Sequence, residues 1–171
     1  MSKLIGRAIA ESPEIQTLIS RLVGEISQAE ESIATIRPPR PELIEPALRS
    51  VVDAGKHRGR PLFFPYVGTG AGRGPYVELE DGSVKLDLIN GIGIHIFGHG
   101  HPRIREAAVR GALSDVVMQG NLEPNHEYAR LGKRLTELAG RHSRLKYAWF
   151  STCGTMANEN ALKMVRQKNS P

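Results

Sequence analysis

A short apolar run that breaks at a glycine and restarts as a helix is the feature that most constrains this sequence. Residues Tyr147–Phe150 have the composition of a buried strand, and Gly154 favours a tight turn after them. From Thr155 onward, apolar residues recur at helical spacing. The first turn of such a helix leaves backbone N–H groups unpaired at the positive end of the helix dipole, so it would hold a phosphate. The residues alone leave a second interpretation open, in which Thr155 only caps a helix after an ordinary strand–helix turn.

The segment Thr152–Glu159, TCGTMANE, resembles a cofactor-binding stretch of one enzyme family. It is similar to the Asn-Ser-Gly-Thr-Glu-Ala-Asn-Glu stretch of class III pyridoxal-phosphate aminotransferases, the acetylornithine, ornithine and 4-aminobutyrate group. The resemblance implies that Cys153, Gly154 and Thr155 bind the phosphate of pyridoxal 5'-phosphate, mostly through backbone N–H groups and the Thr155 hydroxyl. Cys153 stands where the family usually has Ser, and Met156 where it often has Glu. Because a thiol is a weak donor, backbone contacts would carry more of the binding here.

A second segment, Gly74–Pro102, supports the same family. It looks like the family's Tyr-Val hairpin around Asp-Gly, its Gly-Ile-Gly turn and its Gly-His-x-His-Pro helix entry. Asn121 and Leu122 also fit, so the resemblance covers roughly residues 60 to 168 in order. It implies an α/β chain that forms the amino-terminal part of a fold-type I pyridoxal-phosphate-dependent transferase. The expected parts are a helical arm, a small-domain β-hairpin and the start of the large-domain sheet, over residues 1–60, 61–140 and 141–171.

The expected strand before Gly154 has no neighbouring strand in its vicinity, and a lone strand is not stable. Its backbone groups and the apolar face of the next helix require further strand–helix units. In the family, the lysine that forms a Schiff base with pyridoxal phosphate and the Asp that holds the pyridine nitrogen lie far downstream. Lys163 matches a non-catalytic position of the motif. We therefore assign no catalytic residue and expect the chain alone not to transaminate.

The function implied by the resemblance is transfer of an amino group between an amino acid or amine and a 2-oxo acid. The family's active site lies at a dimer interface, which implies a homodimer or a complex with the remaining carboxy-terminal polypeptide. An alternative stays open, in which the chain is a truncated, non-catalytic interaction or regulatory module of the same fold. The sequence does not indicate which compounds serve as amino donor and acceptor.

Composition and charge argue against other classes of protein. The net charge is +5, but the mild basic clusters are not interleaved with aromatic residues, so we expect no nucleic-acid partner. No apolar run is long enough for a signal sequence or a membrane span. Cys153 is the single cysteine, which excludes an intramolecular disulfide and fits a cytoplasmic protein.

Upstream of these motifs, periodicity predicts a long amphipathic helix over Pro13–Ile36, capped by Ser12, and a second helix over Glu42–Ala54. Prolines between Arg37 and Pro41 separate the two. The apolar stripe of such a helix needs a partner surface, either its own domain or a second subunit.

The glycine-rich stretch Gly68–Gly74 leads into a hairpin pattern and not a helix, so we interpret it as a flexible connector, not a dinucleotide site. His95, His99 and His101 form a cluster with no carboxylate at a matching interval, so no metal site is assigned. Helices are expected over 103–117 and 126–139. In the second, buried leucines precede a left-handed Gly140.

Overall fold

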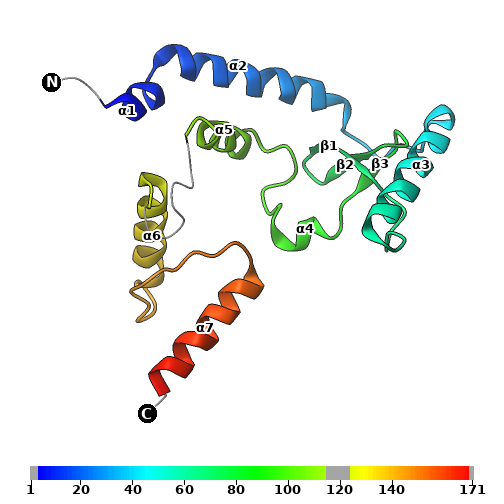
Figure 1. The fold of residues 1–171 in the computed structure, drawn as a ribbon. Coiled ribbons are helices and arrows are strands. Elements are labelled where there is room, and N and C mark those ends of the chain that lie inside the picture. The colour runs from blue at the N-terminus through cyan, green and yellow to red at the C-terminus, as the bar shows by residue number, and fades with distance from the viewer. Residues whose placement is uncertain (1–3, 115–123, 170–171) are drawn as a thin grey trace. The chain divides into compact units, whose positions relative to one another are not determined.

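The computed structural model describes residues 4–114 and 124–169, which form two units, Met1–Ser114 and Asp115–Pro171 (Figure 1). The elements of the first unit are α1 (Ile5–Ala10), α2 (Pro13–Ala29), the 3-10 turn η1 (Glu30–Ser32), α3 (Pro41–Arg58), β1 (Gly68–Arg73), β2 (Tyr76–Leu79), β3 (Val84–Leu86), α4 (Asn90–Gly93) and α5 (Pro102–Gly111). Those of the second are α6 (His126–Ala139) and α7 (Gly154–Asn169). Helices combined with a small antiparallel sheet confirm the α/β class. The expected divisions near residues 60 and 140 stay predictions.

The three strands form one antiparallel sheet in the order β1-β2-β3, with the predicted hairpin at its centre. The hairpin turns at Gly82, where φ is +76°, a value that favours glycine. Val84 is fully buried and Leu79 is 8% exposed, so the hairpin supplies part of the small core of this unit. The chain before α3 joins the sheet, because Arg37 and Val84 exchange both backbone hydrogen bonds, at 3.1 and 3.0 Å.

The glycine-rich stretch is a strand, so its interpretation as a flexible connector was wrong. β1 pairs with β2 through Gly68 and Gly72, and the register shifts between them. Glycine is required at Gly72 because a Cβ there would lie 2.8 Å from the Cβ of His99 and from the carbonyl oxygen of Tyr76. The glycines therefore allow close approach of backbone segments, a use of glycine within strands that periodicity does not reveal.

Helix α2 is shorter than the helix predicted for Pro13–Ile36, and it packs against another helix of its own unit. α2 begins at Pro13, where the Ser12 hydroxyl accepts a hydrogen bond from the Ile15 amide, as expected for the cap. It ends at Ala29 instead of Ile36, because the following residues turn and then extend along the sheet. Two residues of its stripe, Ile19 and Val23, are buried, and the helix packs against α5.

An ion pair between Glu30 and Arg105 fastens η1 to α5. Both guanidinium nitrogens of Arg105 donate to the Glu30 carboxylate, at 2.9 and 2.6 Å. The Glu30 side chain is 8% exposed and that of Arg105 is 21% exposed. A buried carboxylate is stable only when paired, and the fork of a guanidinium satisfies both of its oxygens. This contact also positions the loop before α5, since a Cβ at Gly100 would lie 2.7 Å from Glu30 Oε2.

The remaining predicted helices are present with altered ends. α3 extends to Arg58, four residues beyond the predicted Ala54, and closes at Gly59 with φ +75°. α5 begins at Pro102 as the His-Pro pair predicts, but it ends at Gly111. The last part of the predicted helix, residues 115–117, lies outside the described residues.

In the second unit the predicted strand is not formed. Residues 147–150 pair with no strand, Tyr147 is 94% exposed and Trp149 is 55% exposed. Within residues 124–169 there is no neighbouring strand to satisfy their backbone groups, so the start of a sheet that we expected here is absent. The leucines of α6 are likewise 40–50% exposed instead of buried, and Gly140 has a right-handed φ of −65°. The helix itself spans His126–Ala139, as predicted.

The Glu30–Arg105 pair gives a test of this fold. Glu30→Gln should lower the free energy of unfolding by about 1.5 to 3 kcal/mol, the range for hydrogen bonds to charged groups, because it leaves the Arg105 guanidinium without a counter-charge. Asp53→Asn is the matched control, since Asp53 pairs with Lys56 at the surface and should change stability by less than about 0.5 kcal/mol. Urea unfolding followed by circular dichroism measures both. Equal stabilities for the two variants would contradict the role given to Glu30.

Candidate functional site

The predicted phosphate site lies at the amino terminus of α7, a helix of 16 residues. Cys153 immediately precedes the helix, Gly154 is its first residue and Thr155 its second. All three are exposed, and the thiol of Cys153 is free. The structure therefore brings the three predicted site residues together at one helix end.

The backbone groups at this end are oriented as the sequence predicts. The Ala157 amide donates to the Cys153 carbonyl at 3.0 Å, which is the first hydrogen bond of the helix. In the described part of the chain, no acceptor is found for the amides of Gly154, Thr155 and Met156. These groups lie at the positive end of the helix dipole and are free to donate to an anion. The Ser151 hydroxyl donates to the Cys153 carbonyl at 3.1 Å, which steadies the approach to the helix.

Gly154 does not adopt the tight turn that the sequence predicts for it. Its φ is not in the left-handed region that favours glycine, and a Cβ added to it would meet no atom within 4 Å. The helix begins at Gly154 itself, one residue earlier than expected.

Lys163, the first lysine after the phosphate motif in the sequence, lies well along the same helix. At roughly 1.5 Å per residue it is about 13 Å from Gly154 along the axis. Its ammonium group pairs with Glu159 at 2.9 Å, one helical turn earlier. Lys163 is thus engaged in a surface ion pair with Glu159, well along the helix from the amides of the first turn.

A second arrangement, around Asp87, was missed by the sequence reasoning. His99 Nε2 lies 2.7 Å from Asp87 Oδ2, and the two side chains are 16% and 17% exposed. The other carboxylate oxygen accepts from the amides of Ile89 and Asn90, both at 2.9 Å. The hydrogen bond from His99 and those from these amides hold the pKa of the Asp87 carboxyl below its ordinary value. An Asp that follows a strand and accepts from amides two and three residues ahead is a recognisable turn signal, but its pairing with His99 is not local.

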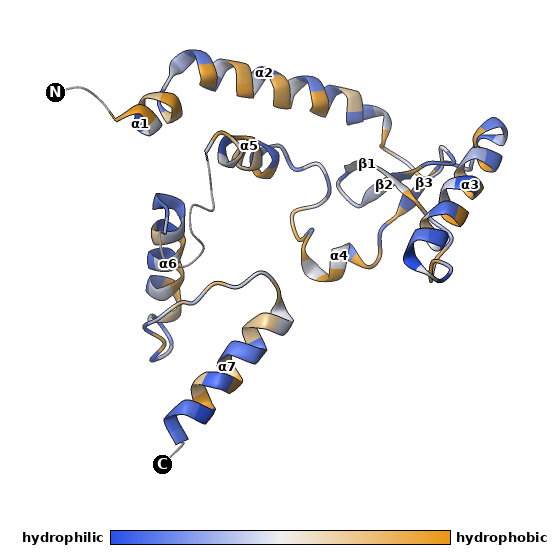
Figure 2. Cartoon of the chain, in the orientation of Figure 1, coloured by the Kyte–Doolittle hydropathy of each residue, from blue (hydrophilic) through white to orange (hydrophobic). Residues whose placement is uncertain are grey.

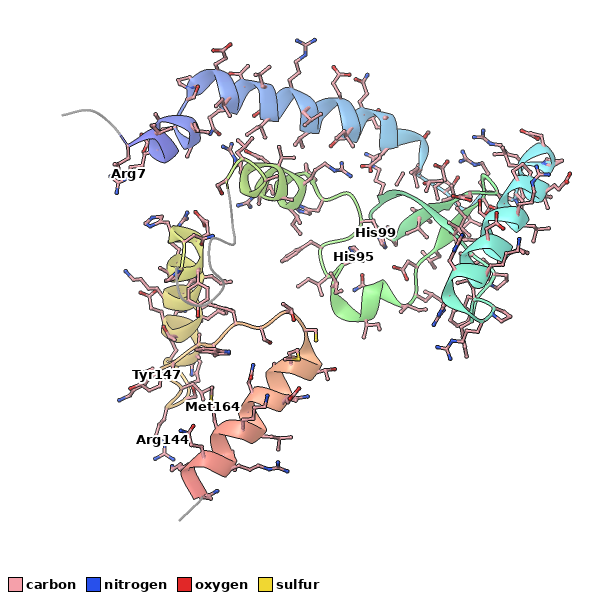
Figure 3. The ribbon with its side chains drawn as sticks, viewed as in Figure 1. Arg7, His95, His99, Arg144, Tyr147 and Met164 are labelled. Carbon is pink, nitrogen blue, oxygen red and sulfur yellow. The ribbon has the colours of Figure 1, made fainter. Side chains whose placement is uncertain are left out.

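The Asp87–His99 contact joins the two ends of the loop between β3 and α5. Gly74 and His99 exchange two backbone hydrogen bonds at 3.0 and 2.8 Å beside it. The rings of His95 and His99 lie side by side with centroids 4.0 Å apart (Figure 3). Asn90 and Ile92 have positive φ values of 54° and 58°, an unfavourable conformation for a β-branched residue such as Ile92. Asp87 and His99 therefore hold a strained loop in place.

The histidine cluster was also compared with the arrangement that a metal ion requires. In residues 4–114 and 124–169, no three side chains of His, Cys, Asp or Glu are placed to hold an ion together. Nor is any helix of the described chain both long enough and apolar enough to span a bilayer.

Comparison with known proteins identifies one family. The family model for aminotransferase class-III matches residues 58–171, about two thirds of the chain. The acetylornithine aminotransferase of Methanocaldococcus jannaschii is 35% identical over 96 residues, which are 56% of this chain and 23% of that protein. The corresponding enzyme of Mycobacterium tuberculosis is 32% identical over 102 residues, covering 60% and 25%.

A third relative comes from Pyrococcus abyssi, a putative [LysW]-aminoadipate semialdehyde/glutamate semialdehyde transaminase. It is 39% identical over 95 residues, covering 56% of this chain and 25% of that protein. The chain thus spans about a quarter of the length of these curated relatives. No solved structure matches the chain significantly.

The Asp87 cluster predicts a pH-dependent contribution to stability. Because its pKa is lowered on folding, the Asp87 carboxylate stabilises the fold above its unfolded pKa, and this contribution is lost as the pH falls below about 4. Asp87→Asn should cost about 1.5 to 3 kcal/mol at neutral pH, the range for hydrogen bonds to charged groups. Chemical unfolding at a series of pH values should show the gap to the unmodified chain closing in acid. A gap that stays constant with pH would show that the charge of Asp87 contributes nothing.

Proposed function

This chain belongs to the class-III aminotransferase family, and we propose on that premise that it forms the cofactor-phosphate site of a pyridoxal-phosphate-dependent transaminase. Such an enzyme transfers an amino group between an amino acid or amine and a 2-oxo acid. The observation that carries the proposal is the set of unpartnered amides at the start of α7, on the residues that match the family's phosphate motif. The three relatives described above are named as aminotransferases or transaminases, which supports the same reaction class.

The donor set at α7 fits a phosphate monoester. Three amides point from one helix end, and the Thr155 hydroxyl adds a side-chain donor. A Cβ placed at Gly154 would meet no atom within 4 Å, so the surroundings of this residue are open. Cys153 adds only a weak donor, so backbone amides carry most of the binding. Bound there, pyridoxal phosphate would supply the electron sink for amino-group transfer. The role of the chain's own residues is to hold and orient the phosphate.

The covalent attachment of the cofactor belongs, in this proposal, to polypeptide outside the matched quarter of the relatives. Lys163 is engaged with Glu159 and lies far along α7 from the free amides. No other lysine of this chain matches a catalytic position of the family. A helix-end site contributes on the order of 1 kcal/mol from the dipole, with hydrogen bonds of similar size. The chain alone would therefore bind the cofactor weakly and would not turn over.

The exposed apolar faces of the second unit indicate which partners the chain needs. Neither α6 nor α7 has a buried residue among those described. Leu162, Met164 and Val165 are each more than 50% exposed. Apolar surface of this extent is normally covered by other protein. We take the covering protein to be the remaining polypeptide of the family fold or a second subunit, in an enzyme of the cytoplasm.

Binding of the phosphate can be tested by blocking the helix end. Gly154→Val should weaken the binding of pyridoxal phosphate about tenfold or more, because the added side chain occupies the space in front of the amides. Ala161→Val is the control, since it adds a β-branched side chain to the same helix away from its start. Absorbance titration with the cofactor measures both. Unchanged affinity in a folded Gly154→Val variant would remove the helix end from the site.

The assignment of the covalent step predicts an inactive chain. Purified chain mixed with pyridoxal phosphate, an amino donor and 2-oxoglutarate should form no product above a blank. The same assay on a Lys163→Met variant is the control for local chemistry. Steady product formation by the chain that disappears in Lys163→Met would show that this lysine serves the reaction, and would overturn the assignment.

A further inference from the structure

The first unit contains a hollow where the end of α2, η1, the end of β1 and the start of α5 come together. Its volume is about 630 Å³, within the range of about 300 to 1,000 Å³ that small-molecule sites have. Figure 2 shows hydrophilic positions between the hydrophobic ones along α2, which packs against α5. The polar lining includes Ser27, Glu31, Arg73 and His101, and the apolar lining includes Phe97 and Pro102.

Two buried polar atoms of this hollow have no hydrogen-bond partner among the described residues. They are the hydroxyl oxygen of Ser27, near the end of α2, and Nδ1 of His101, at the start of α5. Most buried polar atoms in proteins are hydrogen-bonded, so each of these two requires an explanation. His101 precedes Pro102 at the helix start, but its side chain makes no capping hydrogen bond to α5. A molecule bound in the hollow can satisfy both atoms.

The hollow also carries one charge of each sign that is not neutralised by a neighbour. The Arg73 guanidinium donates to the backbone carbonyl of Glu31 at 3.4 Å, which places it beside η1. Within the described part of the chain, neither Arg73 nor the Glu31 carboxylate forms an ion pair, and both residues are exposed. Ser27 is four residues before Glu31, about one helical turn, so the two lie on the same side. Glu30, by contrast, is occupied by Arg105.

These groups together fit a zwitterion better than a simple ion. An anion would be repelled by Glu31 and a cation by Arg73, whereas a molecule that carries both charges is attracted by both residues. A guanidinium and a hydroxyl donate to a carboxylate, and a carboxylate and a neutral imidazole nitrogen accept from an ammonium group. Phe97 is 66% exposed, and its ring meets that of His101 with centroids 5.8 Å apart. This aromatic surface suits an apolar side chain on the ligand.

We propose that this hollow binds a free α-amino acid with an apolar side chain. Arg73 and Ser27 hold its carboxylate, and Glu31 and His101 hold its ammonium group. The ligand bridges α2 and η1 to β1 and α5, so it also stabilises the first unit by binding the folded chain. All lining residues lie between 24 and 102, and none belongs to the phosphate site at the start of α7. The proposal therefore does not rest on the proposed function.

Three related compounds test the recognition of both charges. Isothermal titration of the full chain, with no pyridoxal phosphate present, should show binding of L-phenylalanine. N-acetyl-L-phenylalanine keeps the carboxylate but lacks the ammonium group, and L-phenylalaninamide keeps the ammonium group but lacks the carboxylate. Each should bind about tenfold more weakly or worse, because each loses the charge-assisted hydrogen bonds of one group. Without cofactor in the cell, the result is independent of the site at α7.

Two variants assign the charges to their residues. Arg73→Gln should weaken L-phenylalanine about tenfold and leave L-phenylalaninamide unchanged, and Glu31→Gln should weaken L-phenylalanine equally but leave N-acetyl-L-phenylalanine unchanged. Arg49→Gln and Glu45→Gln make the same changes on α3, where the two residues pair at the surface, and should not alter binding. Circular dichroism verifies the fold of each variant. No binding of L-phenylalanine, equal affinity for all three compounds, or affinity unaffected by Arg73→Gln and Glu31→Gln would overturn the proposal.

Discussion

The ion pair between Glu30 and Arg105 is the contact on which the first unit depends most. The pair fixes η1 to α5. The loop before α5 lies so near that a Cβ added to Gly100 would be 2.7 Å from Glu30 Oε2. Few apolar side chains are buried in this unit, namely Ile19, Val23, Ile33, Leu79 and Val84 among the residues described. With so small a core, polar contacts of high sequence separation decide how the helices and the sheet are joined. The Asp87–His99 pair does the same for the loop between β3 and α5.

Local patterns predicted those elements whose reasons are local. The bounds of α6, the Ser12 cap, the Pro102 start of α5 and the hairpin around Gly82 all follow from periodicity, capping and turn chemistry. Cys153, Gly154 and Thr155 lie together at the start of a helix, as the contiguous motif predicts. Their role in binding stays a prediction.

Where the sequence reasoning failed, the deciding contacts were distant in the chain. β1 is a strand because its glycines allow close approach to β2 and to His99, which no window of sequence shows. The Asp87–His99 contact joins residues on opposite sides of a loop. Conversely, residues 147–150 have the composition of a strand but have no strand beside them in the described chain, and backbone groups without partners do not form a sheet. The composition of residues 147–150 allows a strand, but a strand forms only where neighbouring strands provide hydrogen-bond partners.

The central claim is that the free amides at the start of α7 hold the phosphate of pyridoxal phosphate, and amide nuclear magnetic resonance tests it most directly. Titration of the isotope-labelled chain with pyridoxal phosphate should shift the amide resonances of Gly154, Thr155 and Met156 first. Pyridoxal, which has the same ring without the phosphate, should leave them in place. Equal shifts with both compounds, or shifts confined to other residues, would contradict the claim.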